Sequence, residues 1–502
     1  MHTSNPDGPQ SQPRSRAPTH RAIPPRPLPA STPPLPRVPL PPAMTPYRSE
    51  PLARARPAPF LRRLLRPRAV VRAKRLAGLP TYIPPALFGL LIIPFGIVTG
   101  YCGVTLPRVF EQAGESTTAV AAFQAFALQP HSFKFMIEPA LDARWRKRSW
   151  FLVSIVLTAV FLAASVLFQR MRGGVSFGGI HLGQLALMGA LLFVANGAVA
   201  TSSGAMNAVM AVTLPKEKKG SAAGWAMAGN LGGYGIGGAI GLFVTQKLPT
   251  PIAAVTMGAL VILAAMPALL IHEAKPPSHP IFVAVKNLLR DAWKTMKSKE
   301  GWTGMVICAS PVGCGGLTGL FSDMASKYGA GDNQVALVNG LFGGIVSAIG
   351  CIGGGYVADK MNRRLAYALA GLLTGVIAIT MSLMPMTPNV YTTGCLAYQL
   401  ANGVAYAAWA AFVLDLMGND AAVATKHALL AAAANQATNY MLVFDGLAAD
   451  GHVLGGRLGH GPIAALRADA LGTAVGLVVI TIMLVFVRKM KRPSPPPVAA
   501  AT

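Results

Sequence analysis

Residues 354–364 read GGYVADKMNRR, and residues 139–148 read PALDARWRKR. Each stretch closes an apolar run with an aspartate, Asp359 or Asp142, and then continues into a cluster of cations. The two aspartates are 217 residues apart, about half of the apolar part of the chain. This recurrence predicts that the apolar part is built from two repeats.

The composition is that of an integral membrane protein. Of 502 residues, 52% are hydrophobic and only 12% are charged, and the mean hydropathy is +0.46. The apolar stretches are about 18 to 25 residues long, which suits helices that rise ~1.5 Å per residue and cross a ~30 Å hydrocarbon layer. They lack the period-2 alternation of a barrel. We therefore predict an all-α fold of twelve transmembrane helices at 84–107, 118–141, 150–168, 182–213, 221–245, 252–271, 302–325, 335–358, 365–385, 391–416, 423–447 and 468–487.

The repeat divides these spans into six and six, because Asp142 follows the second span and Asp359 follows the eighth. Transporters with parallel repeats use such a pair of six-helix bundles around a central site. The expected organisation is a tail over 1–80, a bundle over 81–271, a cytoplasmic linker over 272–300, a bundle over 301–490 and a tail over 491–502.

Two of these segments differ in composition from the bundles. The first 80 residues are rich in Arg and Pro and lack apolar periodicity, which predicts disorder. The true start is expected later, at Met44 or beyond. In the linker, apolar residues from Ile281 to Met296 recur at helical spacing, which predicts an amphipathic helix along the bilayer face.

The net charge of +26 orients the chain rather than pointing to nucleic acid. If the amino terminus is cytoplasmic, 36 of the 44 Lys and Arg lie on that side and seven on the other. The excess remains when the amino-terminal tail is left out, so the positive-inside rule predicts a multi-pass protein with both termini in the cytoplasm.

The second copy of the loop carries the spacing Gly355-x-x-x-Asp359-Lys360-x-x-Arg363-Arg364, with Asn362 where Gly is usual. It resembles the loop signature of the major facilitator superfamily, and Asp142 with Arg144 form the matching first copy. A gating role is expected: Gly for close helix approach, Asp to cap a neighbouring helix, and Arg to pair with acids or lipid phosphates.

Three longer stretches narrow the resemblance. SFKFMIEPALDARWRKRSWFL (132–152), LPKEKKGSAAG (214–224) and ATKHALLAAAANQATNYMLVFDG (424–446) are similar to AmpG-like muropeptide permeases and their acetyl-CoA transporter relatives. The resemblance implies import of a polar solute across the bacterial inner membrane, with muropeptides as the type substrate and protons as the driving ion. Ser203 and Asn207 stand where those relatives carry acids, so substrate and proton site stay open, and a permease for a ferric siderophore or other metabolite is an alternative.

Lys134 and Glu138 raise the question of charge within an apolar span. Lys134 lies eight residues before Asp142, ~12 Å along a helix, where a charge costs about 2.5–3.5 kcal/mol. Glu138, at i+4, makes an internal ion pair one interpretation. Contact with the solute is the other, and His131, one turn away, is a candidate proton relay or a packed, hydrogen-bonded side chain.

Polar side chains also gather on two other spans. Ser203 and Asn207 share a face of span four with Asn196, and Asn435 and Asn439 share one of span eleven with Gln436. Amides that converge suit a sugar or peptide, while interhelical hydrogen bonds of about 0.6 kcal/mol are the alternative. Asp445 follows the span-eleven face and is a candidate proton carrier or a helix cap.

The sequence favours no enzyme, metal site or cofactor. GAGD (329–332) is similar to an intramembrane protease motif, but no YD partner occurs in a neighbouring span, and a P-loop is absent. The five cysteines lack CxxC spacing, and His452 and His460 share a Gly-rich loop with Asp450. We expect a monomeric permease whose partners are a small polar solute, protons and the bilayer. A membrane sensor of transporter fold that does not transport is the rival class.

Overall fold

The structure is a computed structural model, and all residues that it describes belong to one compact unit within Leu64–Thr502. It describes residues 84–137, 141, 145–169, 175–177, 180–214, 216–271, 281–417 and 423–490. Both terminal tails, Glu138, Asp142 and Arg144 lie outside these ranges, so the predictions made for them stay predictions.

Helices form at each of the twelve predicted positions. Those of the first half are α2 (Pro85–Gly100), η1 (Tyr101–Thr105), α3 (Leu106–Ala113), α4 (Thr117–Leu128), α5 (Pro130–Phe133), η2 (Lys134–Met136), α7 (Lys147–Phe168), α8 (Gln184–Thr213), α9 (Lys216–Lys247), α10 (Thr250–Ala265) and η3 (Met266–Leu270). Between α7 and α8, β1 (Val175–Phe177) and β2 (Ile180–Leu182) form an antiparallel hairpin that the all-α prediction did not include.

The second half begins after the linker segment. Its elements are α11 (Ile281–Lys297), α12 (Lys299–Ala309), η4 (Gly316–Gly319), α13 (Phe321–Met324), η5 (Ala325–Tyr328), α14 (Asp332–Val335), η6 (Ala336–Phe342), α15 (Gly343–Lys360), α16 (Arg363–Leu383), α17 (Pro388–Met417), α18 (Val423–Ala449), η7 (Leu454–Gly456) and α19 (Gly461–Met490). Seven helices of the described residues are long and apolar enough to cross a membrane by length and composition. The two-bundle, twelve-helix fold is confirmed.

Two spans predicted as single helices are interrupted. The second is divided between Leu128 and Pro130, because Pro130 has no N–H to donate to the preceding turn. The seventh stops at Ala309 and resumes at Gly316, because Gly313 and Gly315 adopt φ of +58° and +71°. The carbonyls released by this second break still find donors from neighbouring helices, as the membrane interior requires: Tyr367 Oη donates to Val312 O over 2.8 Å, and Thr438 Oγ1 donates to Cys314 O over 2.8 Å.

A stripe of glycines on α9, formed by Gly229, Gly233 and Gly237, packs inside the first half. Gly233 lies against Ile93 and Gly96 of α2, where a Cβ would come within 2.5 Å of Ile93 O. Gly229 and Gly237 also face the α2 backbone. The stripe therefore lets two helices of the same bundle approach closely.

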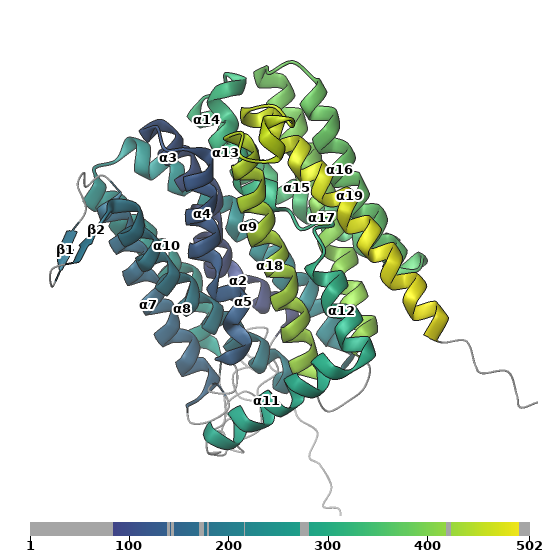
Figure 1. The fold of residues 1–502 in the computed structure, drawn as a ribbon. Coiled ribbons are helices and arrows are strands. Elements are labelled where there is room, and N and C mark those ends of the chain that lie inside the picture. Colours follow the sequence, from purple (N-terminus) through teal and green to yellow (C-terminus); the bar gives the residue numbers. More distant parts are fainter. Residues whose placement is uncertain are drawn as a thin grey trace, which may run out of the picture. The chain divides into compact units, whose positions relative to one another are not determined.

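Different surfaces join the two halves. α4 lies beside α18, and α9 lies beside η6 and α15 (Figure 1). Gly235 of α9 faces Gly340 and Gly344 across the second contact. We call the end of the helices at which α11 lies the linker end, and the end that holds the α3–α4 turn and α14 the opposite end (Figure 1).

Candidate functional site

The central polar layer is a group of side chains at mid-span, where α4 gives way to α5. Asn196 lies twelve residues into α8, ~18 Å from its start, and Asn435 lies twelve residues into α18. The layer consists of Gln129, His131, Ser132, Asn196, Asn435, Gln436 and Asn439.

His131 is a buried member of the layer. Its Nε2 lies 2.9 Å from Asn196 Oδ1, and its ring lies 4.8 Å from that of Phe95. Asn196 Nδ2 donates to Leu192 O over 2.9 Å, which fixes the amide so that its oxygen faces the histidine. His131 Nδ1 has no hydrogen-bond partner among the described residues. The arrangement makes Nε2 the donor to Asn196 and leaves Nδ1 able to accept.

Three hydrogen bonds of the layer cross between the halves. Asn435 Nδ2 of α18 donates to His131 O over 3.0 Å. Asn439 Nδ2 donates to Gln129 Oε1 over 2.8 Å, and Ser132 Oγ donates to Gln436 Oε1 over 2.9 Å. His131 O is available for the first of these because α5 ends at Phe133 and the chain continues as the 3-10 turn η2, and the last carbonyls of an α-helix lack an intrahelical donor.

The structure brings together only some of the predicted residues. His131, Asn435 and Asn439 meet in the layer. Ser203 is buried farther along α8, but Asn207 is exposed, so the predicted span-four face does not converge as one surface. The three residues share one face of α8, but the packing that covers this face at Asn196 and Ser203 does not reach Asn207.

Lys134 lies half-buried in η2, on the linker side of the layer. The positive charge of Lys134 interacts electrostatically with His131 and with His427 of α18. His427 was not among the predicted site residues. The signal for His427 was available, since it lies at i−8 from Asn435 in the same span. The proposed Lys134–Glu138 pair includes a residue outside the described ranges and stays a prediction.

The second gating loop forms a charged cluster at the linker end. Arg363 of α16 pairs with Asp359 of α15 at 3.8 Å and with Asp415 of α17 at 2.5 Å. Lys360 Nζ lies 4.1 Å from the ring centroid of Tyr356, and Arg364 is half-buried. These contacts tie three helices of one half together.

Two roles predicted within this loop were wrong. Gly355 faces open space, and Gly354 is the residue that permits close approach, because a Cβ there would lie 2.7 Å from Val404 Cα of α17. Asp359 does not cap α16: the side chain of Asn362 does, by accepting the N–H of Arg364 over 3.0 Å. The motif predicted the positions of the close-approach glycine and of the helix cap to within a few residues. The rotation of α15 about its axis decides which glycine faces α17.

A seal of charged and polar residues joins the halves at the opposite end. Arg108 of α3 donates to Asp332 Oδ1 of α14 over 2.7 Å and to Ser326 Oγ over 2.6 Å. It also pairs with Glu111, whose Oε1 accepts the N–H of Ser326 over 3.1 Å. Gln112 donates to the same Asp332 oxygen over 2.8 Å. With 7% of its side chain exposed, Arg108 lies at the centre of this seal.

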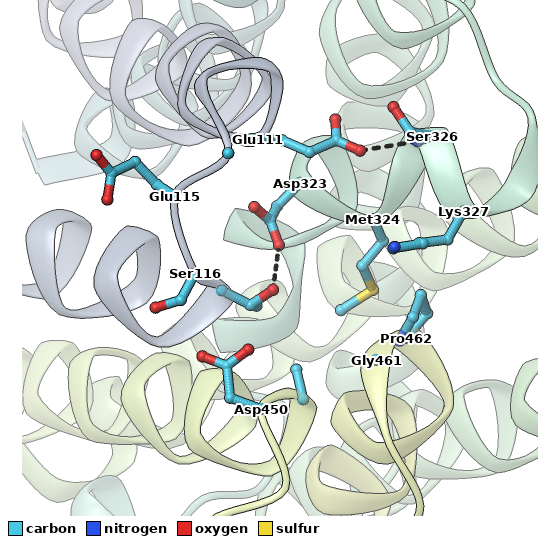
Figure 2. A pocket seen from close by; sticks show the side chains of 13 residues that line it. Glu111, Glu115, Ser116, Asp323, Met324, Ser326, Lys327, Asp450, Gly461 and Pro462 are labelled. Carbon is cyan, nitrogen blue, oxygen red and sulfur yellow. Dashed lines mark hydrogen bonds between the residues drawn. The ribbon is translucent and has the colours of Figure 1, made fainter.

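The α3–α4 turn continues the seal beside a pocket of about 520 Å³ (Figure 2). Thr117 Oγ1 donates to Asp323 over 2.7 Å, and the N–H of Thr118 donates to Asp450 over 2.8 Å. Both acids belong to the second half, and Lys327 lines the same pocket.

Sequence reasoning missed the seal. It treated Arg108 as one cation of an outer loop and Asp332 only as part of GAGD, and their pairing joins residues 224 positions apart. Asp445, predicted to handle protons, is fully buried in α18, and neither of its carboxyl oxygens has a hydrogen-bond partner among the described residues.

Comparison with known proteins gives a single family. The profile described as Major Facilitator Superfamily matches residues 88–429. No curated protein matches the sequence. Among solved structures, a D-xylose-proton symporter is similar with a TM-score of 0.56 and 13% identity over 79% of this chain and 95% of that one. The inward open conformation of the xylose transporter XylE from E. coli is similar with a TM-score of 0.55 and 13% identity over 80% of this chain and 95% of that one. At this identity the likeness concerns the fold.

Proposed function

The chain belongs to the major facilitator superfamily, and from this premise we propose that it imports a small polar solute across the bacterial inner membrane by proton-coupled secondary transport. The observation that carries the proposal is the central polar layer, which lies at mid-span and takes side chains from both halves. In transporters built from two repeats, solute sites lie at this depth between the bundles.

The chemistry of the layer suits a solute with hydroxyl and amide groups. Asn435, Asn439 and Gln436 each offer a donor and an acceptor, and His131 Nδ1 offers an acceptor. Such groups match a muropeptide, which combines sugar and peptide, and also match a sugar alone. D-Xylose, carried by a symporter that shares the fold, therefore belongs in the substrate test.

Solute binding in the layer would act directly on the contact between the halves. The amides that would hold the solute are those that now bond across the interface, for example Asn435 to His131 O. A solute that replaces these bonds changes the free energy of one arrangement of the halves relative to another, which is the requirement for coupling binding to movement.

The proposed orientation rests on the positive-inside distribution, which puts the linker end and both termini in the cytoplasm. The opposite end then faces the periplasm. In this orientation the seal around Arg108 closes the route to the periplasm in the conformation described here.

The test is uptake by the full chain reconstituted in proteoliposomes, with and without an inward proton gradient. The labelled panel is an anhydro-muropeptide, a ferric siderophore, a dipeptide and D-xylose. We expect gradient-stimulated accumulation of one member. Uptake of the ferric siderophore would favour the alternative function, a siderophore permease. No gradient-stimulated uptake of any member contradicts the proposal and favours a sensor that does not transport.

For the solute that is taken up, Asn439→Ala should raise KM about tenfold, as expected when a buried polar contact of about 1–2 kcal/mol is lost. Asn389→Ala is the matched control, because Asn389 is exposed at the start of α17. Equal KM values for the two variants would exclude Asn439 from the binding site.

A further inference from the structure

A pair of buried carboxyl groups lies in the second half, outside the polar layer. Asp445 lies in α18, four residues before that helix ends, and is 0% exposed. Asp469 lies in α19, eight residues after that helix begins, and is 2% exposed. α18 and α19 pack against each other, and the two carboxyl groups interact electrostatically. In the sequence, Asp469 is a single acid near the start of an apolar run.

The surroundings of the pair contain little to stabilise negative charge. Asp469 accepts a hydrogen bond from Tyr398 Oη of α17 over 3.0 Å, whereas both oxygens of Asp445 are without a donor. The other titratable group that acts on both acids is Cys314, in the break before η4. α4, which packs against α18 from the first half, presents Gln124, Thr117 and Thr118 there, none of which titrates. Among the described residues, no cation acts on either carboxyl.

Charge balance limits the protonation states that this site can adopt. Two carboxylates near each other in an apolar interior repel each other, and each loses the solvation that water would give it. Acids inside membrane spans therefore pair, face water or carry protons. Among the described residues, Asp445 has no hydrogen-bond donor and no cation to stabilise its negative charge. In the closed arrangement the two carboxyl groups must therefore hold at least one proton between them.

The position of Asp445 connects the pair to the contact between the halves. Its neighbour Gly446 lies against α4, where a Cβ would be 2.6 Å from Ala121 Cβ, and Gly446 O accepts from Thr118 Oγ1 over 3.2 Å. Asp450, one turn farther along the chain, accepts the N–H of Thr118. The segment that carries Asp445 is thus covered by α4 as long as the opposite end is sealed.

We propose that Asp445 and Asp469, with Tyr398 as hydrogen-bond donor, form the proton-binding site that couples the proton gradient to transport. The proposal rests on the proposed function and specifies its coupling site. A proton enters from water when α4 and α18 separate at the opposite end, and it is retained when the seal re-forms. It leaves when the linker end opens and the site meets water on that side.

The first test needs no solute. Infrared difference spectra of the purified full chain, recorded while the pH is raised from neutral to alkaline, should show loss of the C=O band of a buried protonated carboxyl. Asp445→Asn/Asp469→Asn should lack this band, and Asp291→Asn, in the amphipathic α11, should keep it. Tyr398→Phe removes only one hydroxyl, and the band should persist to higher pH because the ionised Asp469 loses its donor. A double variant with the wild-type band overturns the proposal.

The second test uses the panel member taken up by wild-type proteoliposomes. Asp445→Asn should reduce gradient-driven accumulation at least tenfold while solute exchange at equal concentrations on both sides stays within twofold of wild type. Gradient-driven accumulation at the wild-type level in the double variant overturns the coupling site and leaves the proposed function standing. A pH-dependent carboxyl band that the double variant lacks, together with no flux of any solute, overturns the proposed function and leaves the proton-binding pair standing.

Discussion

At the opposite end, Arg108 of one half bonds to Asp332 and Ser326 of the other, whereas at the linker end Arg363 pairs with Asp359 and Asp415 of its own half. The exposure of these pairs differs as well. The Arg108 side chain is 7% exposed and that of Arg363 is 35% exposed. Buried ion pairs respond strongly to the loss of one partner, and exposed pairs contribute little.

The comparison teaches that position relative to the interface decides what a charged cluster can control. The Arg108 seal must open before the halves can separate at the opposite end. The Arg363 cluster holds three helices of one bundle in place and can stay intact while that bundle moves as a body. Both are clusters of Arg and Asp at helix ends, so composition alone does not distinguish them.

The largest expected effect comes from making the opposite end unable to open. Thr117 Oγ1 and Asp323 Oδ2 are 2.7 Å apart, so the two side chains meet across the halves, and the pair Thr117→Cys/Asp323→Cys is the one to cross-link by oxidation. Oxidation should reduce uptake by about tenfold or more, because the closed end can no longer exchange solute. Reductant should restore it, and each single variant under the same oxidant is the control. Full uptake by a verified cross-linked protein would contradict a moving opposite end.

The second-largest effect is expected from a substitution that weakens the contacts at the same end. Arg108→Gln removes the ion pairs with Asp332 and Glu111, and a shift of about 1.4 kcal/mol toward separation would raise the open population about tenfold. Labelling of Gln124→Cys measures this, because residue 124 is buried behind the seal. Arg290→Gln, in the exposed pair with Asp291 on α11, is the matched control. Equal labelling rates in the two variants would show that Arg108 does not hold the end closed.

A smaller effect is expected at the polar layer, between the two ends. Ser132→Ala and Gln436→Ala each remove one bond that crosses the halves, and a double-mutant cycle on Gln124→Cys labelling should give a coupling of about 0.6 kcal/mol, close to threefold. Additive effects, with no coupling, would mean that this bond does not help to hold the halves together.

The smallest effect is expected at the linker end. Arg363→Gln breaks contacts of a partly exposed cluster, typically about 0.2–1 kcal/mol, and it leaves the interface between the halves unchanged. Labelling of Gln124→Cys should stay within about twofold of the parent, since the cluster lies in one bundle. A change as large as that of Arg108→Gln would remove the distinction between the two ends.

Sequence reasoning predicted what depends on local composition. Apolar length gave the twelve helices, and recurrence of the Asp–Arg loop gave the two halves. His131, Asn435 and Asn439 were singled out because a polar group inside a membrane span is energetically costly, and the structure brings these three side chains into one layer.

What the sequence did not reveal depends on tertiary contacts. The Arg108–Asp332 bond joins segments more than two hundred residues apart, and Asp469 looked like an ordinary residue near the start of an apolar run. Gly354 rather than Gly355 meets α17 because of a helix rotation that periodicity does not specify. The interruption at Gly313 and Gly315 could not be predicted from the sequence, because glycine is also frequent inside uninterrupted membrane helices.

The most direct test of the account is a pair of distance measurements in the same proteoliposomes, one across each end. Spin labels at Glu115→Cys and Lys327→Cys span the opposite end, and labels at Arg146→Cys and Lys360→Cys span the linker end. Lowering the pH outside in the presence of the transported solute should lengthen the first distance in part of the population and shorten the second in the same fraction. Unchanged distances at both ends, or changes in the same direction, would contradict the proposal that the halves alternate around the central polar layer.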